Sequence, residues 1–271
     1  MFCSIDRFFS AVLLATALFA APAFAQTPLP HAHAHNDYYH KRPLLDALDH
    51  GFCNVEADIY LVQGQLLVGH ERWELRTNRS LASLYLDPLK ERIAANGGHV
   101  YETPKPFILM IDIKTNGEEV YAALEKLLAQ YDFISVTEDG KHQEKAVTVV
   151  ISGARPKKSV AEANPRHVGL DGRLSDLNTN WPAELMPVIS DKWGSHFKWK
   201  GQGPMPEAEQ AKLKEIVEKT HAKGRKLRFW GTPEDPKFWA VLQSSGVDLI
   251  GTDDLEKLSE FLSSSDSSTP E

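Results

Sequence analysis

The 271-residue sequence is short of cysteine and has no excess of positive charge. It contains two cysteines, and its 30 Lys and Arg residues stand against 37 Asp and Glu residues, which gives a net charge of −7. Binding to a nucleic-acid backbone needs a positive face, and no Lys/Arg-rich stripe with aromatic residues is present. The composition therefore argues against a nucleic-acid partner. No repeat or low-complexity block interrupts the body of the chain.

The two cysteines cannot pair in a processed chain. Cys3 lies in the first 25 residues, which have the pattern of a leader peptide, and only Cys53 remains beyond them. Cys53 stands in the apolar stretch GFCNVEADIYLV. We interpret it as a small buried hydrophobic residue, with a reactive thiol as the alternative.

Residues 1–25 have the pattern of an export signal. The apolar run FFSAVLLATALF follows Arg7, and AFA at 23–25 resembles a cleavage site. The run is too short and wrongly flanked for a membrane span. We therefore expect a signal peptide over 1–25, cleavage near Ala25/Gln26, and an exported protein that is periplasmic or secreted. We expect a monomer that makes at most peripheral contact with a membrane.

The rest of the chain alternates between short β-branched apolar runs and longer amphipathic runs. This pattern favours a parallel sheet with helices on its outside, and eight strand–helix units match a TIM (β/α)8 barrel. We predict a single α/β barrel domain over 26–262 and a Ser-rich, disordered tail over 263–271. A hairpin, VQGQLLVGH, follows the second strand. The predicted strands are HAHN, CNVEADIYLV, PFILMIDIK, AVTVVIS, RHVGLDG, MPVIS, KLRFWG and VDLIGT.

Ionisable residues gather where the first three predicted strands end, which is the mouth where barrel enzymes keep their chemistry. Glu56 and Asp58 are two apart on one strand and point the same way, and Asp112 lies in MIDIK on the next. Three carboxylates form an all-oxygen set suited to Mg²⁺ or Ca²⁺. The alternative is that Glu56 and Asp58 form the solvent face of a half-buried strand. His35, His70 and Lys114 complete the group.

The segments AHND, VEADIYLVQGQLLVGHE and LMIDIKT together resemble the PLC-like phosphodiesterase superfamily. This superfamily includes glycerophosphodiester phosphodiesterases, phosphatidylinositol-specific phospholipases C and venom phospholipases D. The AHNDY opening is similar to that of a bacterial and fungal branch. The resemblance implies a phosphoric diester hydrolase with a TIM barrel, acting on a small-molecule or lipid phosphodiester such as a glycerophosphodiester or a phospholipid headgroup.

The resemblance also implies roles for individual residues. Glu56, Asp58 and Asp112 would hold one divalent cation, Mg²⁺ or Ca²⁺. His35 and His70 would form the acid–base pair, which we assign as base and acid respectively. A hydroxyl of the substrate can then attack first and give a cyclic phosphate.

Four further residues are candidates for contact with the substrate. By resemblance, Lys114 would contact phosphate or orient Asp112, and Trp230 would pack on the leaving group or the glycerol portion. Arg155, with Lys157 behind it, is the candidate phosphate contact after the fourth strand. Neither has motif support, and the alternative for both is solvated surface charge.

The sequence departs from the glycerophosphodiesterase pattern directly after His35. Asn36 and Asp37 follow it where those enzymes have an arginine, and one of their acidic metal ligands is missing. Asp37 is a candidate to replace the ligand. Arg42 is a candidate to replace the positive charge, and the alternative is a surface arginine before Pro43.

Two other classes of function compete with this one. HAH at 33–35 is also how metal-dependent amidohydrolase barrels begin, and Asp253 after the eighth strand fits that scheme. It requires histidines ending the fifth and sixth strands, however, and His167 precedes its strand while His196 lies well past MPVIS. The other alternative is a non-catalytic barrel that binds a metal or a phospholipid.

The histidine-rich stretch HAHAHNDYYHKR at 31–42 then divides into one functional residue and its neighbours. His35 is the predicted catalytic residue. We expect His31 and His33 to belong to a flexible entry to the barrel, and His40 to lie in the loop after the first strand.

Overall fold

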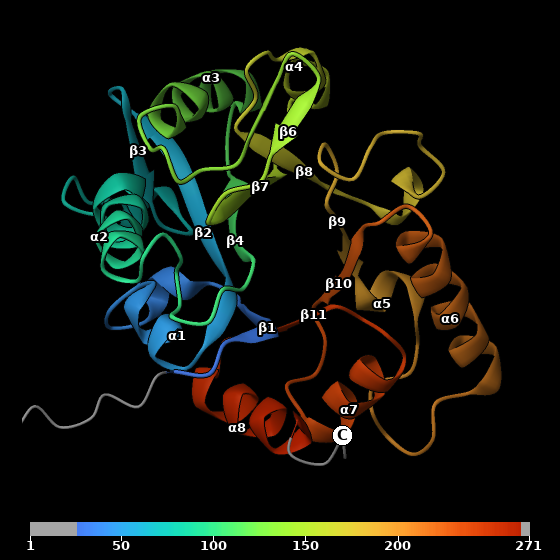
Figure 1. Cartoon of the computed structure of the whole chain (residues 1–271). Helices are drawn as coiled ribbons and strands as arrows, with labels where there is room; N and C mark the ends of the chain where they lie inside the picture. The colour runs from blue at the N-terminus through green and yellow to red at the C-terminus, as the bar shows by residue number, and fades with distance from the viewer. Residues whose placement is uncertain (1–25, 267–271) are drawn as a thin grey trace, which may run out of the picture.

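Eight parallel strands close into a barrel in the computed structural model, which describes residues 26–266 (Figure 1). Their order around the ring is β1-β11-β10-β9-β8-β7-β4-β2, and pairing of β1 with β2 closes it. All eight predicted strands and the TIM barrel are therefore confirmed. The strands are β1 (Leu29–Ala34), β2 (Phe52–Val62), β4 (Phe107–Ile113), β7 (Val147–Gly153), β8 (Val168–Gly172), β9 (Val188–Lys192), β10 (Lys226–Trp230) and β11 (Leu249–Thr252).

Helices surround the barrel, and their apolar faces cover it. In α3 (Gly117–Leu128) the buried residues Val120, Tyr121, Leu124 and Leu128 follow the three-to-four-residue spacing of one helix face. The other helices are α1 (Leu45–Asp49), α2 (Asp87–Ala95) after a π-helical turn η3 (Ala82–Leu86), α4 (Lys157–Glu162), α5 (Trp193–His196), α6 (Glu207–His221), α7 (Pro236–Ser244) and α8 (Leu255–Asp266), with 3-10 turns η1 (Asp37–Tyr39), η2 (Arg72–Glu74) and η4 (Leu174–Asp176). After the fifth barrel strand, β8, the chain forms only the turn η4 where a helix would complete the unit.

Two hairpins extend the strands. In the predicted one, β3 (Gln65–Val68) pairs antiparallel with β2 through Gln63 and Gly64. Both turn residues have positive φ, of 49° and 79°, which is the geometry of a tight hairpin turn. The second hairpin, β5 (Val136–Glu138) with β6 (Lys141–Gln143), was not predicted, although the Asp-Gly pair at its turn is a hairpin signal.

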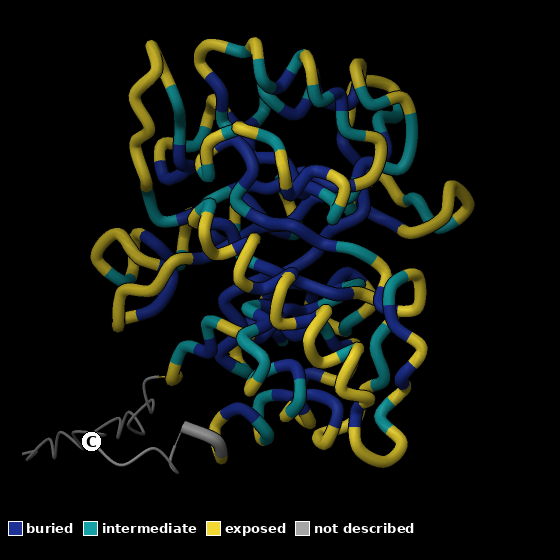
Figure 2. The backbone as a smooth tube through the Cα atoms, turned by 90° about the vertical axis from the view of Figure 1, so that its right-hand side faces the viewer, coloured by how far each residue is buried: buried dark blue, intermediate teal, exposed yellow. Residues whose placement is uncertain are grey.

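Alternation along the strands divides the apolar core into two parts. The larger part packs between the strands and the outer helices, and a small inner cluster includes Ile108 and Met110 of β4. Asp112 follows these two residues at the same spacing of two, so its side chain continues the inner row. Figure 2 shows the buried backbone concentrated in the central strands, with exposed residues on the outer loops and turns. The inner cluster thus forms an apolar floor below the polar mouth.

The ends of the chain lie partly outside the described residues. The predicted signal peptide over 1–25 falls there, as do the last five residues. α8 continues through residues 263–266, which we expected to be disordered. Within 26–266, no helix has the length and apolar character needed to cross a membrane.

Candidate active site

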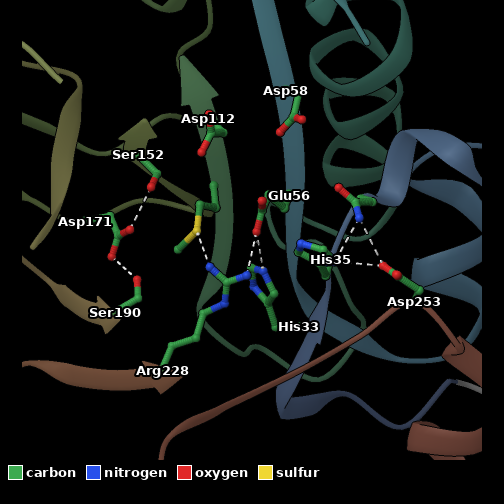
Figure 3. A network of polar contacts seen from close by, with 12 residues as sticks. His33, His35, Glu56, Asp58, Asp112, Ser152, Asp171, Ser190, Arg228 and Asp253 are labelled. Atoms are coloured by element: carbon green, nitrogen blue, oxygen red, sulfur yellow. Dashed lines mark hydrogen bonds and ion pairs between the residues drawn. The ribbon is translucent and has the colours of Figure 1, made fainter. Parts of the chain in front are cut away.

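The three predicted carboxylates meet at the carboxyl-terminal mouth of the barrel. Asp58 on β2 stands opposite Asp112 on β4 in the strand register, and Glu56 lies one inward position below Asp58. One oxygen from each lies within 4.8 Å of the others, and this is the one such group of potential metal ligands in residues 26–266. Figure 3 shows all three side chains directed into the barrel. Because all three oxygens are hard ligands, the cluster can bind a divalent metal ion.

Asp58 is the most heavily shared of the three. Its side chain is 1% exposed, and its Oδ2 accepts from Tyr38 Oη at 2.7 Å, from His70 Nδ1 at 2.9 Å and from Lys114 Nζ at 2.7 Å. Its Oδ1 is buried and has no hydrogen-bond partner among the described residues. An unpaired buried carboxylate oxygen is costly, and a bound cation would remove that cost.

Glu56 is held by two buried basic side chains. Its Oε2 accepts from Arg228 at 2.7 Å and from His33 Nε2 at 2.9 Å. Burial raises the pKa of Glu56, but Arg228 and His33 outweigh it and keep this pKa well below its usual range. Burial and Arg228 lower the pKa of His33 to about 4, so His33 is neutral near pH 7. His33 is therefore a fully buried residue of β1 that orients Glu56, and the prediction of a flexible entry is wrong.

Lys114 links the two strands that carry the cluster. Its Nζ lies 2.7 Å from Asp58 Oδ2 and 3.3 Å from Asp112 Oδ1. Burial raises the pKa of Asp112, and although Lys114 opposes this rise, Asp58 and Glu56 add to it. Lys114 thus reduces the repulsion among the three acids.

His35 and His70 lie at the same mouth, and each is backed by a carboxylate. His35 Nδ1 lies 2.8 Å from Asp253 Oδ1, just past β11, and His70 Nδ1 lies 2.9 Å from Asp58 Oδ2. Burial lowers the pKa of His35, but the bond to Asp253 and the charges of Glu56 and Asp253 together outweigh burial, and the net shift is upward. Their side chains are 36% and 45% exposed. Because both Nδ1 atoms are engaged, each ring presents Nε2 for proton transfer.

Asn36 and Tyr38 connect the two histidines. Asn36 Nδ2 lies 2.9 Å from His35 Nδ1, and its Oδ1 lies 2.7 Å from the Tyr38 hydroxyl, which also contacts Asp58. The hydroxyl has one proton and donates it to one of these oxygens at a time. Burial and Asp58 raise the pKa of Tyr38, so the hydroxyl stays protonated. Sequence reasoning missed both residues, although they belong to the AHNDY motif.

Asp37 and Arg42, the candidates for the missing parts of the glycerophosphodiesterase pattern, both bond to residues outside the acidic cluster. Asp37 is fully buried, and its Oδ2 accepts from the Leu44 amide at 2.6 Å and from the Tyr85 hydroxyl at 2.8 Å. Arg42 is about half exposed and its guanidinium bonds to Asp46 and Asp49 beside α1. Asp37 therefore anchors the loop that carries Asn36 and Tyr38. Arg42 lies as the surface arginine of our alternative would, and its contact with a substrate stays a prediction.

Trp230 and Arg155 lie at different sides of the mouth. Trp230 ends β10, is 39% exposed, and lines a small cleft together with His35 and Asp253. Arg155 follows β7, and its nearest acid is Asp171, whose Oδ2 is 4.0 Å from the guanidinium. Lys157 is held by Asp176 at 2.7 Å and is not available to a phosphate.

The histidines that the amidohydrolase scheme requires are engaged elsewhere. His167 bonds to Glu125 at 2.9 Å, and His196 contacts Asp191 at 3.2 Å. Neither belongs to the acidic cluster. The aromatic residues near His196 pack inward, with Trp193 stacked on Phe197 at 4.1 Å between ring centroids, so they stabilise the barrel wall.

Comparison with protein families shows where the chain belongs. Residues 25–171 match the model of the AIM6-like phosphodiesterase domain. The chain is a member of this family. Altered inheritance of mitochondria protein 6 of Eremothecium gossypii is 31% identical over 86% of this chain and 69% of its own length. Its homolog in Arthroderma benhamiae is 27% identical over 84% of this chain and 82% of its own length.

Solved structures support the same fold. A calcium-dependent phosphoinositol-specific phospholipase C from a Pseudomonas species matches 86% of this chain and 92% of its own, with a TM-score of 0.55 and 15% identity. A glycerophosphodiester phosphodiesterase from Parabacteroides distasonis matches 89% of this chain and 99% of its own, with a TM-score of 0.52 and 14% identity. The predicted membership of the PLC-like phosphodiesterase superfamily is confirmed.

The comparisons overturn the predicted location. We expected a periplasmic or secreted protein on the pattern of residues 1–25. The curated relatives reported above are fungal proteins named for the inheritance of mitochondria, and they are not bacterial exported proteins. The prediction of an exported protein is therefore wrong.

Asp37 generates a prediction for the pH dependence of stability. Burial raises its pKa from 3.8 to about 7, so the folded chain keeps a proton that the unfolded chain loses above pH 4. The stability that Asp37 contributes is fully present below its pKa in the unfolded chain. It is lost as the pH rises through its pKa in the folded chain. We expect the free energy of unfolding of the wild type to fall between pH 5 and 8, relative to Asp37→Asn, by on the order of 2–3 kcal/mol. Denaturant unfolding at several pH values measures this difference, and parallel curves for the two proteins would contradict it.

Proposed function

We propose that this protein hydrolyses phosphoric diesters, with a glycerophosphodiester or a phospholipid headgroup as substrate. The observation that carries the proposal is the arrangement of His35 and His70. Each is backed by a carboxylate, and His70 bonds directly to Asp58, a member of the group formed by Glu56, Asp58 and Asp112. A phosphodiester needs its charge offset and its leaving oxygen protonated, and this arrangement offers groups for both tasks.

The two histidines divide the proton transfers. His35 takes a proton from the attacking hydroxyl, either of water or of the substrate itself, and Asp253 stabilises the imidazolium that forms. His70 gives a proton to the departing alkoxide, and Asp58 holds its ring in place. If a substrate hydroxyl attacks, the first product is a cyclic phosphate. Both histidines are partly exposed, which allows a substrate to reach them.

A single Mg²⁺ or Ca²⁺ fits the carboxylates as the residues stand. Asp58 Oδ1 is buried without a partner in the described chain and lies in a group of three acids, so an oxygen is available for a hard cation. Glu56 is the most neutralised of the three because Arg228 and His33 already bind it. When bound, the ion would offset phosphate charge. The phospholipase C from Pseudomonas is described as calcium-dependent, which supports Ca²⁺ as the first ion to test.

Lys114 and Trp230 bind and orient the substrate. Lys114 holds Asp58 and Asp112 and presents a positive charge next to the bound phosphate. Trp230 borders the cleft at His35, where one alcohol portion of the diester packs on its ring.

Hydrolysis and its dependence on the histidines and the cation can be tested together. Phosphorus NMR follows a panel of glycerophosphodiesters, lysophospholipids and phosphatidylinositol with Ca²⁺, with Mg²⁺ and with chelator. We expect turnover with a cation, and a loss of at least about 100-fold in kcat for His35→Ala and for His70→Ala. His31→Ala is the matched control. His31 lies on β1, a few residues before His35, and its exposed side chain bonds to the Asp248 carbonyl. Activity that survives both substitutions, or that persists in chelator, would contradict the mechanism, and no turnover of any diester would favour a binding-only barrel.

The Asn36–Tyr38 connection predicts an effect on kcat. Tyr38→Phe removes the hydroxyl that contacts Asp58 and keeps the ring, so we expect kcat to fall about 10-fold with little change in KM or in the midpoint of thermal unfolding. Tyr39→Phe is the control, because its more exposed hydroxyl bonds only to Glu74 among the described residues. Equal kcat values for the two variants would show that the hydroxyl does not support catalysis.

A further inference from the structure

A second polar cluster lies beside the acidic one, on the strands that follow it around the barrel. Asp171 on β8 is 1% exposed, and its Oδ2 accepts from Ser152 Oγ at 2.8 Å and from Arg173 at 2.6 Å. Its Oδ1 accepts from Ser190 on β9. Figure 3 shows Asp171 between the two serines, facing the same interior as Asp112. The Asp171 carboxylate is thus fixed by three donors.

Arg155 is left without a comparable partner. Its side chain is 11% exposed, and its Nε and one terminal nitrogen are buried with no hydrogen bond to any described residue. Asp171, the nearest acid, is 4.0 Å away and already bonded to Arg173. Buried donors without acceptors are costly, particularly on a charged group. The position therefore lacks an acceptor.

The two acids nearest Arg155 on this side of the mouth are both engaged by other basic side chains. Arg155 and Arg173 share the single carboxylate of Asp171. Asp176, the next acid, is taken by Lys157 at 2.7 Å. Burial and the charge of Arg173 both lower the pKa of Arg155, which agrees with a guanidinium that is not fully paired. An anion would supply both the missing charge and the missing acceptors.

The register places this cluster next to the catalytic one but away from His35. Ser152 on β7 stands opposite Asp112 on β4, so the two clusters share a boundary. β7 is three strands from β1 around the ring, which corresponds to about 14 Å along the sheet at the usual strand spacing. A group bound at Arg155 thus lies beyond the phosphate at which His35 acts as the base, on the same substrate.

We propose that Arg155 and Arg173 bind a second anionic group, a carboxylate or a phosphate monoester on the headgroup of the diester. This inference rests on the proposed function for the site itself and adds a substrate class, diesters whose alcohol carries its own negative charge. Arg155 makes the contact through its free donors. Asp171, held by Ser152 and Ser190, positions Arg173 beside it.

The test uses two probes that differ only by a carboxylate, glycerophosphoserine and glycerophosphoethanolamine. Calorimetric titration of the full chain in chelator measures binding without consuming the diester. We expect the serine probe to bind at least about 10-fold more tightly, as one charge-assisted pair allows. In Arg155→Gln, the affinity for the serine probe should fall to that for the ethanolamine probe, and the affinity for the ethanolamine probe should not change. Arg42→Gln is the control, because that arginine is paired at the surface with Asp46 and Asp49.

Three results would overturn the inference. These are equal affinity of the wild type for the two probes, binding of neither, and equal weakening of both by Arg155→Gln, which would assign Arg155 to the scissile phosphate. If Arg155→Gln does not fold, Arg155→Lys keeps the charge without the two-pronged contact, and an intermediate preference is expected. A glycerophosphodiester whose headgroup carries a phosphate monoester in place of the carboxylate, used as competitor, shows which of the two anions binds more tightly. The titration requires no turnover. A preference for the serine probe, together with no turnover of any diester in Ca²⁺ or Mg²⁺, would reject the proposed function and retain the second anion site.

Discussion

The arrangement of the mouth depends on one buried carboxylate, that of Asp58. One of its oxygens receives a tyrosine hydroxyl, an imidazole and an ammonium group, and the other has no partner within residues 26–266. His70, Tyr38 and Lys114 therefore share one anchor. Displacement of Asp58 would disturb the proposed acid His70, the Tyr38 hydroxyl that links the two histidines, and the ion pair with Lys114 together. The inward direction of this side chain follows from strand alternation on β2, above the apolar floor inside the barrel.

Glu56, one inward position below Asp58 on the same strand, is a second anchor of a different kind. Glu56 is neutralised by Arg228 from β10 and oriented by His33 from β1, so three strands are tied through one carboxylate. Glu56 thus stabilises the barrel as well as contributing an oxygen to the cluster. Asp58 and Asp112 carry charge that is shared by only one lysine, which makes this side of the cluster the more favourable for a cation.

Much of the fold and of the acidic cluster could be predicted because both follow from local periodicity. The eight strands appear as β-branched runs, and residues two apart on a strand share a face, which placed Glu56, Asp58 and Asp112 together. The partners of these residues could not be predicted, because they depend on which strands become neighbours. Arg228 reaches Glu56 across 172 positions of the chain, and Asp253 reaches His35 across 218. The pairing of Arg42 is local instead, since acids four and seven residues further on engage its guanidinium.

The central claim is that Asp58 belongs to a cation site, and direct titration of Ca²⁺ and Mg²⁺ into the full chain tests it most directly. Isothermal calorimetry should show one ion per chain for the wild type and for Asp46→Asn, whose substitution removes a surface acid bonded to Arg42. Asp58→Asn should weaken binding by at least about 10-fold, because it removes one of the few ligand charges. Unchanged affinity in Asp58→Asn, or no binding of either ion by the wild type, would contradict the account.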